Sequence, residues 1–326
     1  MRSLFKAIGC APLSVLWGSE LSLAAPPAFH NQIEGDAPVL WYSLSESLGA
    51  ATTVNRGSYG ATFNGTYNSN PVLGVATLDG DTGASFTAAS QQWIESGAPA
   101  PAEMLGNPTF TVETVVYVPI GAQVVTYAPF LHWGGAANGQ SVFFSFHHTV
   151  NNKGFAGFYN GGLRMTGTFS LNQWHHIVWT RDSAGGTNNA LTGSTFYVDG
   201  VPVALENDPV LPGALVVNVT STTFRVQRAT NFNRHFTGIM DEVVLYNRLL
   251  TPAEITAHHR ALFCTADFNF DGQVGSSDIT AFLSAWFADL AGGTFVADFD
   301  GNNVVGSNDI TAFLSAWFEA LAGGGC

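Results

Sequence analysis

The sequence predicts a mainly β protein, in which an antiparallel jelly-roll β-sandwich is followed by a small all-α C-terminal domain. The sandwich is indicated by residues 36–262, where short strand patterns alternate with turns rich in Gly, Asn, Ser and Pro. Composition agrees, because only 11% of the 326 residues are charged whereas 13% are aromatic, which fits an exported all-β protein and does not fit a disordered one. The helical domain is indicated by a repeated, acidic segment near the C-terminus.

The charge balance excludes a nucleic-acid-binding surface. The chain has 11 Lys and Arg residues against 24 Asp and Glu residues, a formal net charge of −13. A protein that binds nucleic acid needs a basic stripe to neutralise phosphates. After the first 25 residues no apolar run is long enough to cross a membrane. We therefore expect neither a nucleic-acid partner nor a membrane span.

Residues 1–25 have the composition of a secretory signal peptide. Arg2 and Lys6 supply the positive start, an apolar stretch follows over residues 7–17, and small residues near the end offer a cleavage region. We predict export to the extracellular space or the cell surface, with a linker over residues 26–35. A poorly ordered cytosolic tail is the alternative.

Local patterns within residues 36–262 predict individual elements. The dipeptide Asp199-Gly200 predicts a tight hairpin, because a type I′ turn needs positive φ at both central positions. Thr251 and Glu254 have the spacing of a capping box, which predicts a short helix that closes the domain. Period-two alternation predicts strands at 110–118, 142–148, 174–181, 194–198, 223–227 and 239–246.

Several of these segments together resemble a known family. Residues 238–255 contain GIMDEVVLYNR and LTPAEI, which are similar to the last strand and closing helix of the concanavalin A-like (laminin G-like, LamG) jelly-roll family. WHHIVWTR at 174–181 with FYVDG at 196–200 resembles the family's central strand pair, and LWYSL at 40–44 resembles its first strand. The resemblance implies a jelly roll over residues 36–262. It leaves activity open, because this fold carries lectins, glycan hydrolases and interaction modules.

The C-terminal segment, residues 264–326, is acidic and duplicated. It contains eight acidic residues and no Lys, Arg or His, so it carries −8 of the net charge of −13. Such a segment repels itself unless cations bind to it. The block DITAFLSAWF occurs at 278–287 and again, unchanged, at 309–318, and an acidic loop precedes each copy.

The acidic loops have the ligand spacing of EF-hand calcium loops. Ca²⁺ takes roughly six to eight oxygen ligands, which an EF-hand supplies from loop positions 1, 3, 5, 7 and 12. The ligands at these positions are Asp267, Asn269, Asp271, Gln273 and Asp278 in the first loop, and Asp298, Asp300, Asn302, Val304 and Asp309 in the second. We predict two bound Ca²⁺ ions. In the alternative, each loop is an Asp- and Gly-rich turn that only caps the next helix, and the acidic residues stay uncompensated.

The duplicated segment resembles a dockerin, the calcium-loop-and-helix module of cellulosomal proteins. The features that carry the resemblance are Asp at loop position 12 and the lack of a full entering helix before the first loop. The resemblance covers residues 263–326 and implies a cohesin-like scaffold as partner. Dockerins often carry a Lys-Arg pair in the helix after each loop, whereas this chain has Leu-Ser at 283–284 and 314–315. This difference from the dockerin pattern bears on the predicted cohesin binding, and it leaves the predicted calcium ligands unchanged.

Each repeat also contains an apolar stripe with helical spacing, and we predict that the two stripes pack on each other. Such a small unit needs a covalent or ionic staple. Cys264 and Cys326 stand at its two ends, and they are the cysteines that remain after removal of the signal peptide, so we predict a disulfide between them. Two free thiols in a reducing compartment are the alternative. The stripe residues are Ile279, Phe282, Leu283, Trp286, Leu290, Ile310, Phe313, Leu314, Trp317 and Leu321.

No catalytic constellation is evident in the sandwich segment. The run Glu-x-Asp-x-x-Glu, which a hydrolase on this fold would use, does not occur in residues 36–262, and Glu113 is isolated in sequence. Asp241 and Glu242 are adjacent, so we expect them to face opposite sides of a strand. We therefore assign no catalytic residues and expect a secreted, non-catalytic module that binds a polysaccharide or an extracellular protein. The alternative is an extracellular polysaccharide-degrading hydrolase of the glucanase type with a dockerin-like tail.

Two further sites are candidates within the sandwich. The turn-rich segments 55–67 and 132–140 offer a glycan-binding rim, with Tyr59 or Trp133 stacking on sugar rings. In relatives of the jelly-roll family a calcium ion can lie at one rim. A third Ca²⁺ at that place would use Asp79, Asp81 and Asp241.

Overall fold

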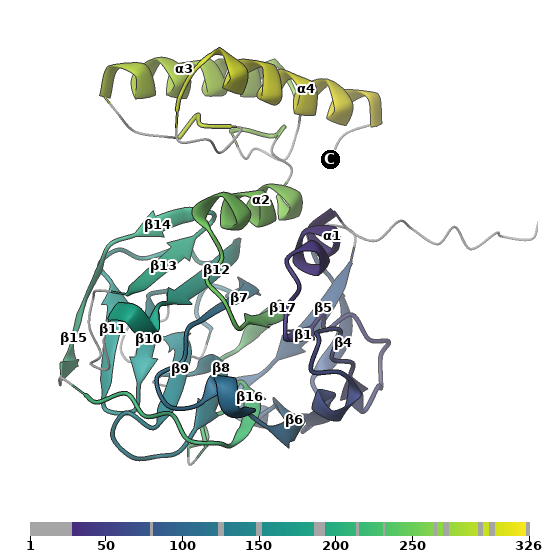
Figure 1. Ribbon diagram of the computed structural model, residues 1–326. Helices are drawn as coiled ribbons and strands as arrows, with labels where there is room; N and C mark the ends of the chain where they lie inside the picture. Colours follow the sequence, from purple (N-terminus) through teal and green to yellow (C-terminus); the bar gives the residue numbers. More distant parts are fainter. Residues whose placement is uncertain are drawn as a thin grey trace, which may run out of the picture.

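Two antiparallel sheets form a sandwich, and two long helices follow it in the computed structural model of the chain (Figure 1). This architecture confirms the predicted fold class. The structure describes residues 28–78, 81–122, 127–147, 152–185, 193–212, 215–230, 232–263, 266–269, 274–292, 296–299 and 304–323.

The strands of the two sheets, as far as the chain is described, follow a non-sequential order. One sheet, the eight-stranded sheet, has the order β14 (Val201–Val203), β13 (Ser194–Val198), β12 (Trp174–Arg181), β7 (Phe110–Tyr117), β17 (Gly238–Tyr246), β5 (Thr82–Phe86) and β4 (Val72–Ala76), with β1 (Leu40–Tyr42) also paired to β17. The other, the nine-stranded sheet, has the order β15 (Leu205–Pro212), β11 (Gly161–Met165), β10 (Gly154–Phe158), β9 (Ser141–Phe146), β8 (Pro129–Gly134), β16 (Thr223–Val226), β6 (Trp93–Pro99), β3 (Gly65–Asn68) and β2 (Thr52–Thr53).

The α-helices lie outside the sandwich. Their bounds are α1 (Ala28–Gly35), α2 (Pro252–Leu262), α3 (Ser276–Gly292) and α4 (Ser307–Gly323), and short 3-10 turns occur at Ala61–Phe63, Ala88–Ser90, Ala102–Met104 and Ser183–Gly185. Within the described part of the chain, no helix has the length and hydrophobicity needed to span a membrane.

The local predictions are confirmed where they can be compared. Each predicted strand segment is a strand, namely β7, β9, β12, β13, β16 and β17. Asp199 (φ 54°) and Gly200 (φ 75°) form the turn between β13 and β14, in which Val198 pairs with Val201. Helix α2 begins with the predicted capping box, because the Thr251 side chain accepts from Glu254 N while the Glu254 carboxylate accepts from Thr251 N.

Strand alternation divides the sandwich into an inner core and two outer faces. On β7, Val112 and Val116 belong to the core between the sheets, whereas Val115 belongs to a separate cluster on the outer face of the eight-stranded sheet. Helices α1 and α2 cover that outer face, with Phe29 and Ile255 fully buried against it. The outer face of the nine-stranded sheet has its own apolar cluster, which is described below.

Residues 28–35, for which the sequence suggested a linker, form helix α1 and pack on the sandwich. Phe29 and Ile33 are fully buried in the cluster beneath α1 and α2. The sequence pattern does not indicate this helix, because the helix is short and its buried side has only two large apolar residues, Phe29 and Ile33. The segment is therefore part of the folded unit.

Helices α3 and α4 pack on each other as predicted. The rings of Phe282 and Phe313 stack at the centre, with centroids 4.3 Å apart. Two reciprocal hydrogen bonds flank this stack, because Trp286 Nε1 donates to Gly306 O (2.8 Å) and Trp317 Nε1 donates to Gly275 O (2.9 Å). One part of the stripe prediction is wrong. Leu290 and Leu321 are 53% and 45% exposed, because the contact between the helices ends at the tryptophans.

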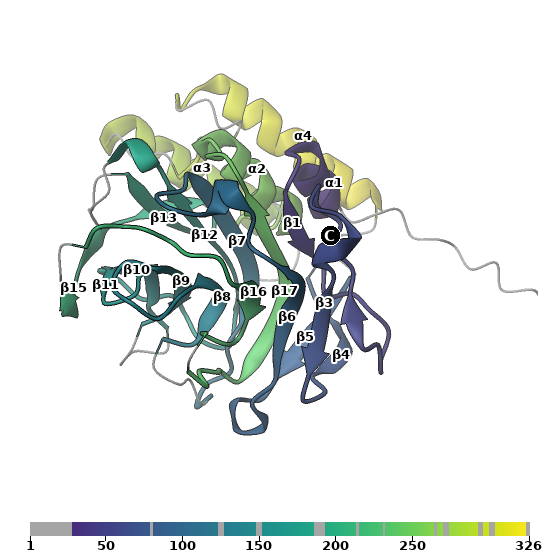
Figure 2. The ribbon, with the colours of Figure 1, turned by 60° about the horizontal axis from the view of Figure 1, so that its bottom comes forward.

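Helices α3 and α4 lie beyond α2, on the side away from most of the strands (Figures 1 and 2). Arg260 of α2 connects the two parts of the chain. Its guanidinium donates to Asp298 O and lies 4.7 Å from the ring centroid of Phe299. The second acidic loop is therefore attached directly to the helix that closes the sandwich.

Candidate functional site

The outer face of the nine-stranded sheet carries an aromatic cluster that takes no part in the inner core. Along β9, Val142, Phe144 and Phe146 point into the core, whereas Phe143 lies in the outer cluster. Phe155 of β10 also belongs to the outer cluster. Alternation in these strands thus places large aromatic side chains on both faces of one sheet.

Paired residues of neighbouring strands form a row across this outer face. Phe143 pairs with Gly157 of β10 on one side and with His132 of β8 on the other, and His132 pairs with Arg225 of β16. Gly162 lies beneath the ring of Phe155, where a Cβ atom would come within 2.0 Å of that ring. Glycine at this position therefore leaves room for the Phe155 ring.

A cavity of about 100 Å³ opens on this face. Its walls include Phe143, Phe155, Tyr127 and Leu211, and the partly exposed Tyr159 and Phe232 stack on each other with ring centroids 6.1 Å apart. Asn160 and Arg234 supply the polar groups of the lining. Aromatic walls with few polar groups are typical of sites for small ligands, including sugars.

A buried polar pair supports one wall of the cavity. Asp208 Oδ1 accepts from Val210 N (2.8 Å) and Leu211 N (3.0 Å), which fixes the bend that places Leu211 in the lining. Asp208 Oδ2 lies 2.9 Å from His147 Nε2, and both side chains are fully buried. The ring of His147 contacts the ring of Tyr127. This wall is therefore held by hydrogen bonds and ring contacts.

The predicted glycan rim is wrong with respect to Trp133. Trp133 is fully buried between the sheets, where its ring packs edge-on against Phe110 and Phe224 and its indole N–H donates to Met104 O. Tyr59 packs against the core and the ring of Phe63. Trp133 therefore lies in the inner core and cannot stack on a sugar, whereas Tyr59 is partly buried against that core.

A second polar constellation lies between the eight-stranded sheet and helix α2, and no pattern in the sequence indicates it. The carboxylate of Glu113 is fully buried on β7 and accepts from Tyr246 Oη (2.7 Å), His176 Nε2 (3.0 Å) and His258 Nδ1 (3.0 Å). His258 Nε2 also donates to Asp36 Oδ2 (2.9 Å). Glu113, which is isolated in sequence, is thus the centre of a network that joins β7, β12, β17 and α2.

The ionisation of this network is set by its charges rather than by burial. Burial alone would lower the pKa of His258, but Glu113 and Asp36 raise it to about 9. Burial likewise opposes ionisation of Glu113, but His258 and His176 hold its pKa below the usual range. The pair is therefore charged at neutral pH and holds α2 on the sheet.

The stability of the protein is expected to fall on the alkaline side of neutrality. His258 has a higher pKa when folded than its ordinary value of 6.5, so its contribution is complete below about pH 6.5 and is lost as the pH rises through about 9. The expected loss in unfolding free energy is on the order of 2 to 3 kcal/mol. Urea unfolding between pH 6 and 10 measures it, and in a His258→Gln variant this part of the pH dependence should disappear.

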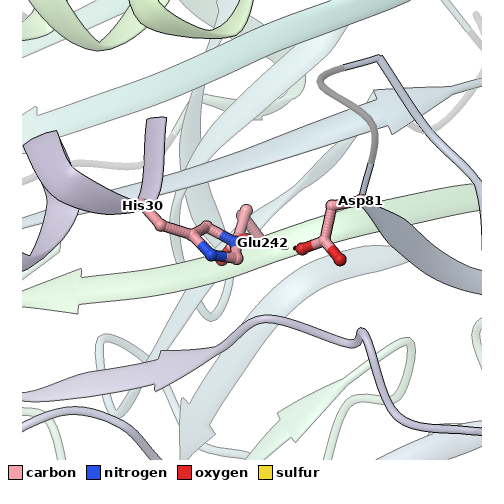
Figure 3. Close-up of side chains that lie close together, drawn as sticks. All are labelled: His30, Asp81 and Glu242. Atoms are coloured by element: carbon pink, nitrogen blue, oxygen red, sulfur yellow. Dashed lines mark hydrogen bonds and ion pairs between the residues drawn. The ribbon is translucent and has the colours of Figure 1, made fainter. Parts of the chain in front are cut away.

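A third cluster joins residues that are distant in the sequence, His30, Asp81 and Glu242 (Figure 3). Their ligand atoms lie within 4.8 Å of one another, with His30 Nε2 3.1 Å from Asp81 Oδ2 and hydrogen-bonded to Glu242 Oε1. Trp41 Nε1 donates to the other oxygen of Glu242. Burial opposes protonation of His30, but Asp81 and Glu242 raise its pKa to about 10. A protonated His30 supplies one positive charge between the two carboxylates and joins α1 to the sandwich.

The residues considered for a third calcium ion are placed as follows. Asp79 lies outside the described residues. Asp81 belongs to the cluster with His30, and Asp241 is buried on β17. A bulge at Glu242 (φ 51°) contradicts the expected alternation, because Met240 and Val243 both lie in the inner core although they are three positions apart.

Among the predicted ligands of the acidic loops, Asp278 and Asp309 are the best defined. Both carboxylates are fully buried. Asp278 accepts from Asn269 N (3.1 Å) and Gly275 N (2.7 Å), and Asp309 accepts from Phe299 N (2.7 Å) and Gly306 N (2.8 Å). In both loops the position-12 side chain accepts from the glycine at position 9, and it also accepts from position 3 in the first loop and from position 2 in the second. Each loop thus holds a buried carboxylate.

The other predicted ligands divide into two groups. Asp267, Asn269, Asp298 and Val304 are described and flank the buried aspartates in sequence. Asp271, Gln273, Asp300 and Asn302, together with Cys264 and Cys326 of the predicted disulfide, lie outside the described residues. An oxygen-rich donor set with a buried carboxylate at its base fits a hard divalent cation.

Comparisons with known proteins concern the sandwich. The family model described as the concanavalin A-like lectin/glucanases superfamily matches residues 89–256. Domain 4 of an extracellular arabinanase of Geobacillus stearothermophilus, solved with arabinotriose, is 16% identical, with a TM-score of 0.46, over 68% of this chain and 98% of that one. A sialidase of Trypanosoma rangeli is 19% identical, with a TM-score of 0.45, over 69% of this chain and 32% of the sialidase. No curated protein matches the chain.

Proposed function

Because the chain belongs to the concanavalin A-like lectin/glucanases superfamily, we propose that it is a carbohydrate-binding protein whose ligand enters the cavity on the outer face of the nine-stranded sheet. The observation that carries this proposal is the composition of the cavity. Tyr159 and Phe232 offer aromatic faces at its mouth, beside the amide of Asn160 and the guanidinium of Arg234. Sugar rings present C–H faces that stack on aromatic rings and hydroxyl groups that bond to amides and guanidinium groups.

Replacement of Phe232 by Ala is expected to weaken glycan binding about tenfold or more, because the stacked aromatic surface at the mouth would be lost. A glycan array first identifies the ligand, and calorimetry then compares the variant with the native protein. Phe287→Ala is the matched control, since this phenyl ring is 64% exposed on α3, far from the cavity in sequence and on another domain. Equal losses in both variants, or none in Phe232→Ala, would place the ligand elsewhere.

Incubation of the protein with the glycan that it binds tests the competing function, hydrolysis of that glycan. If the protein shortens the glycan that it binds, newly formed reducing ends accumulate with time. Such turnover would assign the chain to the hydrolases of this superfamily instead of its binding modules.

For the C-terminal domain, residues 263–326, we propose a dockerin-like calcium module that attaches the sandwich to an extracellular scaffold. Two Ca²⁺ ions would be held by the loop ligands predicted from the sequence, with Asp278 and Asp309 as the closing carboxylates. The ions would supply the positive charge that the segment lacks. The paired burial of both aspartates and the reciprocal tryptophan hydrogen bonds support this proposal. Export of the protein and the Cys264–Cys326 disulfide are parts of the same proposal.

A further inference from the structure

We infer that the carbohydrate bound at this site is acidic, and that carboxylate or sulfate groups of the glycan pair with Arg228 and Arg234. This inference rests on the proposed binding function and specifies its ligand class. The overall charge of the chain argues against an anionic ligand, since the formal net charge is −13. On the outer face of the nine-stranded sheet, however, arginines make the local charge positive.

Three arginines of this face each lie over an aromatic ring. Arg225 and Arg228 both lie over Trp93, at 5.9 and 4.3 Å from its ring centroid. Arg234 lies over Phe232 and Tyr127, at 4.5 and 5.2 Å. Stacking fixes the plane of a guanidinium and leaves its N–H edges to bind planar anions.

Two exposed or partly exposed carboxylates of this face are paired with Arg225 and Arg164. Glu95 Oε1 accepts from Arg225 Nη2 (2.8 Å), and Glu206 Oε1 accepts from Arg164 Nε (2.7 Å). Arg228 has no carboxylate within ion-pair distance among the residues that the structure describes, and its Nε is buried there without a hydrogen-bond acceptor. A partly buried guanidinium without an anion is an incomplete arrangement that an acidic ligand would complete.

The positive charge of these arginines also lowers the pKa values of two neighbouring histidines. Burial, together with the charges of Arg225 and Arg234, lowers the pKa of His132 to about 3. His235, whose pKa burial also lowers, is affected in the same direction by Arg228. Glu95 neutralises Arg225, so the net attraction on an anion at this face comes from Arg228 and Arg234.

The test compares three polysaccharides, namely polygalacturonate, a sulfated galactan and a neutral galactan, by calorimetry with the full-length protein. We expect binding of at least one acidic polymer and at least tenfold weaker binding of the neutral one. Arg228→Gln should lower the affinity for the acidic polymer about tenfold or more. Preference for polygalacturonate over the sulfated galactan identifies the group as a carboxylate, and the reverse identifies it as a sulfate.

Arg56→Gln is the control, because it removes the same charge from an exposed arginine that lies over Trp41 beside the other sheet.

A salt titration of the native protein does not depend on any variant folding, and the affinity for the acidic polymer should fall several-fold between 50 and 500 mM NaCl. Equal affinity for acidic and neutral polymers, insensitive to salt and to Arg228→Gln, would overturn the inference and leave the binding function intact. Binding of no carbohydrate at all would instead overturn the proposed function.

Discussion

Removal of calcium is expected to unfold the C-terminal domain while the sandwich stays folded. Residues 264–326 carry eight acidic residues and no basic ones, and two of the carboxylates, Asp278 and Asp309, are fully buried. Without a cation these charges repel one another in a low dielectric. An ion present at a thousandfold its dissociation constant stabilises a domain by about 4 kcal/mol per site, which is comparable with the entire stability of so small a unit.

Differential scanning calorimetry of the full-length protein with Ca²⁺ and with EDTA measures this effect. We expect two transitions with Ca²⁺ and the loss of one of them in EDTA, together with the loss of the helical signal of α3 and α4. Asp278→Asn and Asp309→Asn should each remove most of the calcium response. Glu319→Gln, which removes one charge from an exposed position on α4 outside the loops, should retain it. Identical melting curves with and without metal would contradict the calcium assignment.

The features that the sequence could predict are those encoded by neighbouring residues. The turn at Asp199-Gly200, the capping box at Thr251 and the pairing of the two repeats all depend on spacings of a few residues, and all are present in the structure. The pairing of Phe282 with Phe313 follows from the repeat itself, because two copies of one apolar stripe can bury each other.

The features that could not be predicted depend on long-range contacts. Trp133 was expected at a surface rim because it is followed by a Gly- and Asn-rich turn, yet strand β8 directs it inwards. The bulge at Glu242 shifts the register within one strand, which no alternation pattern indicates. The walls of the cavity come from β9, β10, β15 and three connecting segments, so they meet only after the sheet has formed.

The network around Glu113 is the clearest example of such a long-range feature, and its removal should have the second large effect. Glu113→Ala is expected to lower the unfolding free energy by about 3 to 5 kcal/mol, because the charged His258 would remain buried without its main partner. Glu113→Gln should be less destabilising, since an amide oxygen still accepts from Tyr246. Urea unfolding of each variant measures these differences.

A double-mutant cycle separates the loss of this ionic interaction from the loss of packing. In Glu113→Gln/His258→Gln neither member of the central pair is charged, so the double variant should be more stable than the sum of the single losses implies, by about 1 to 3 kcal/mol. Because His258 lies on α2 and also bonds to Asp36 at the end of α1, the same variants should loosen both helices that cover the eight-stranded sheet, and hydrogen exchange in α1 and α2 should quicken before that of β7. Additive single losses, with unchanged exchange in these helices, would mean that Glu113 acts only as a space-filling side chain and that apolar burial of Phe29, Ile33 and Ile255 alone attaches the helices.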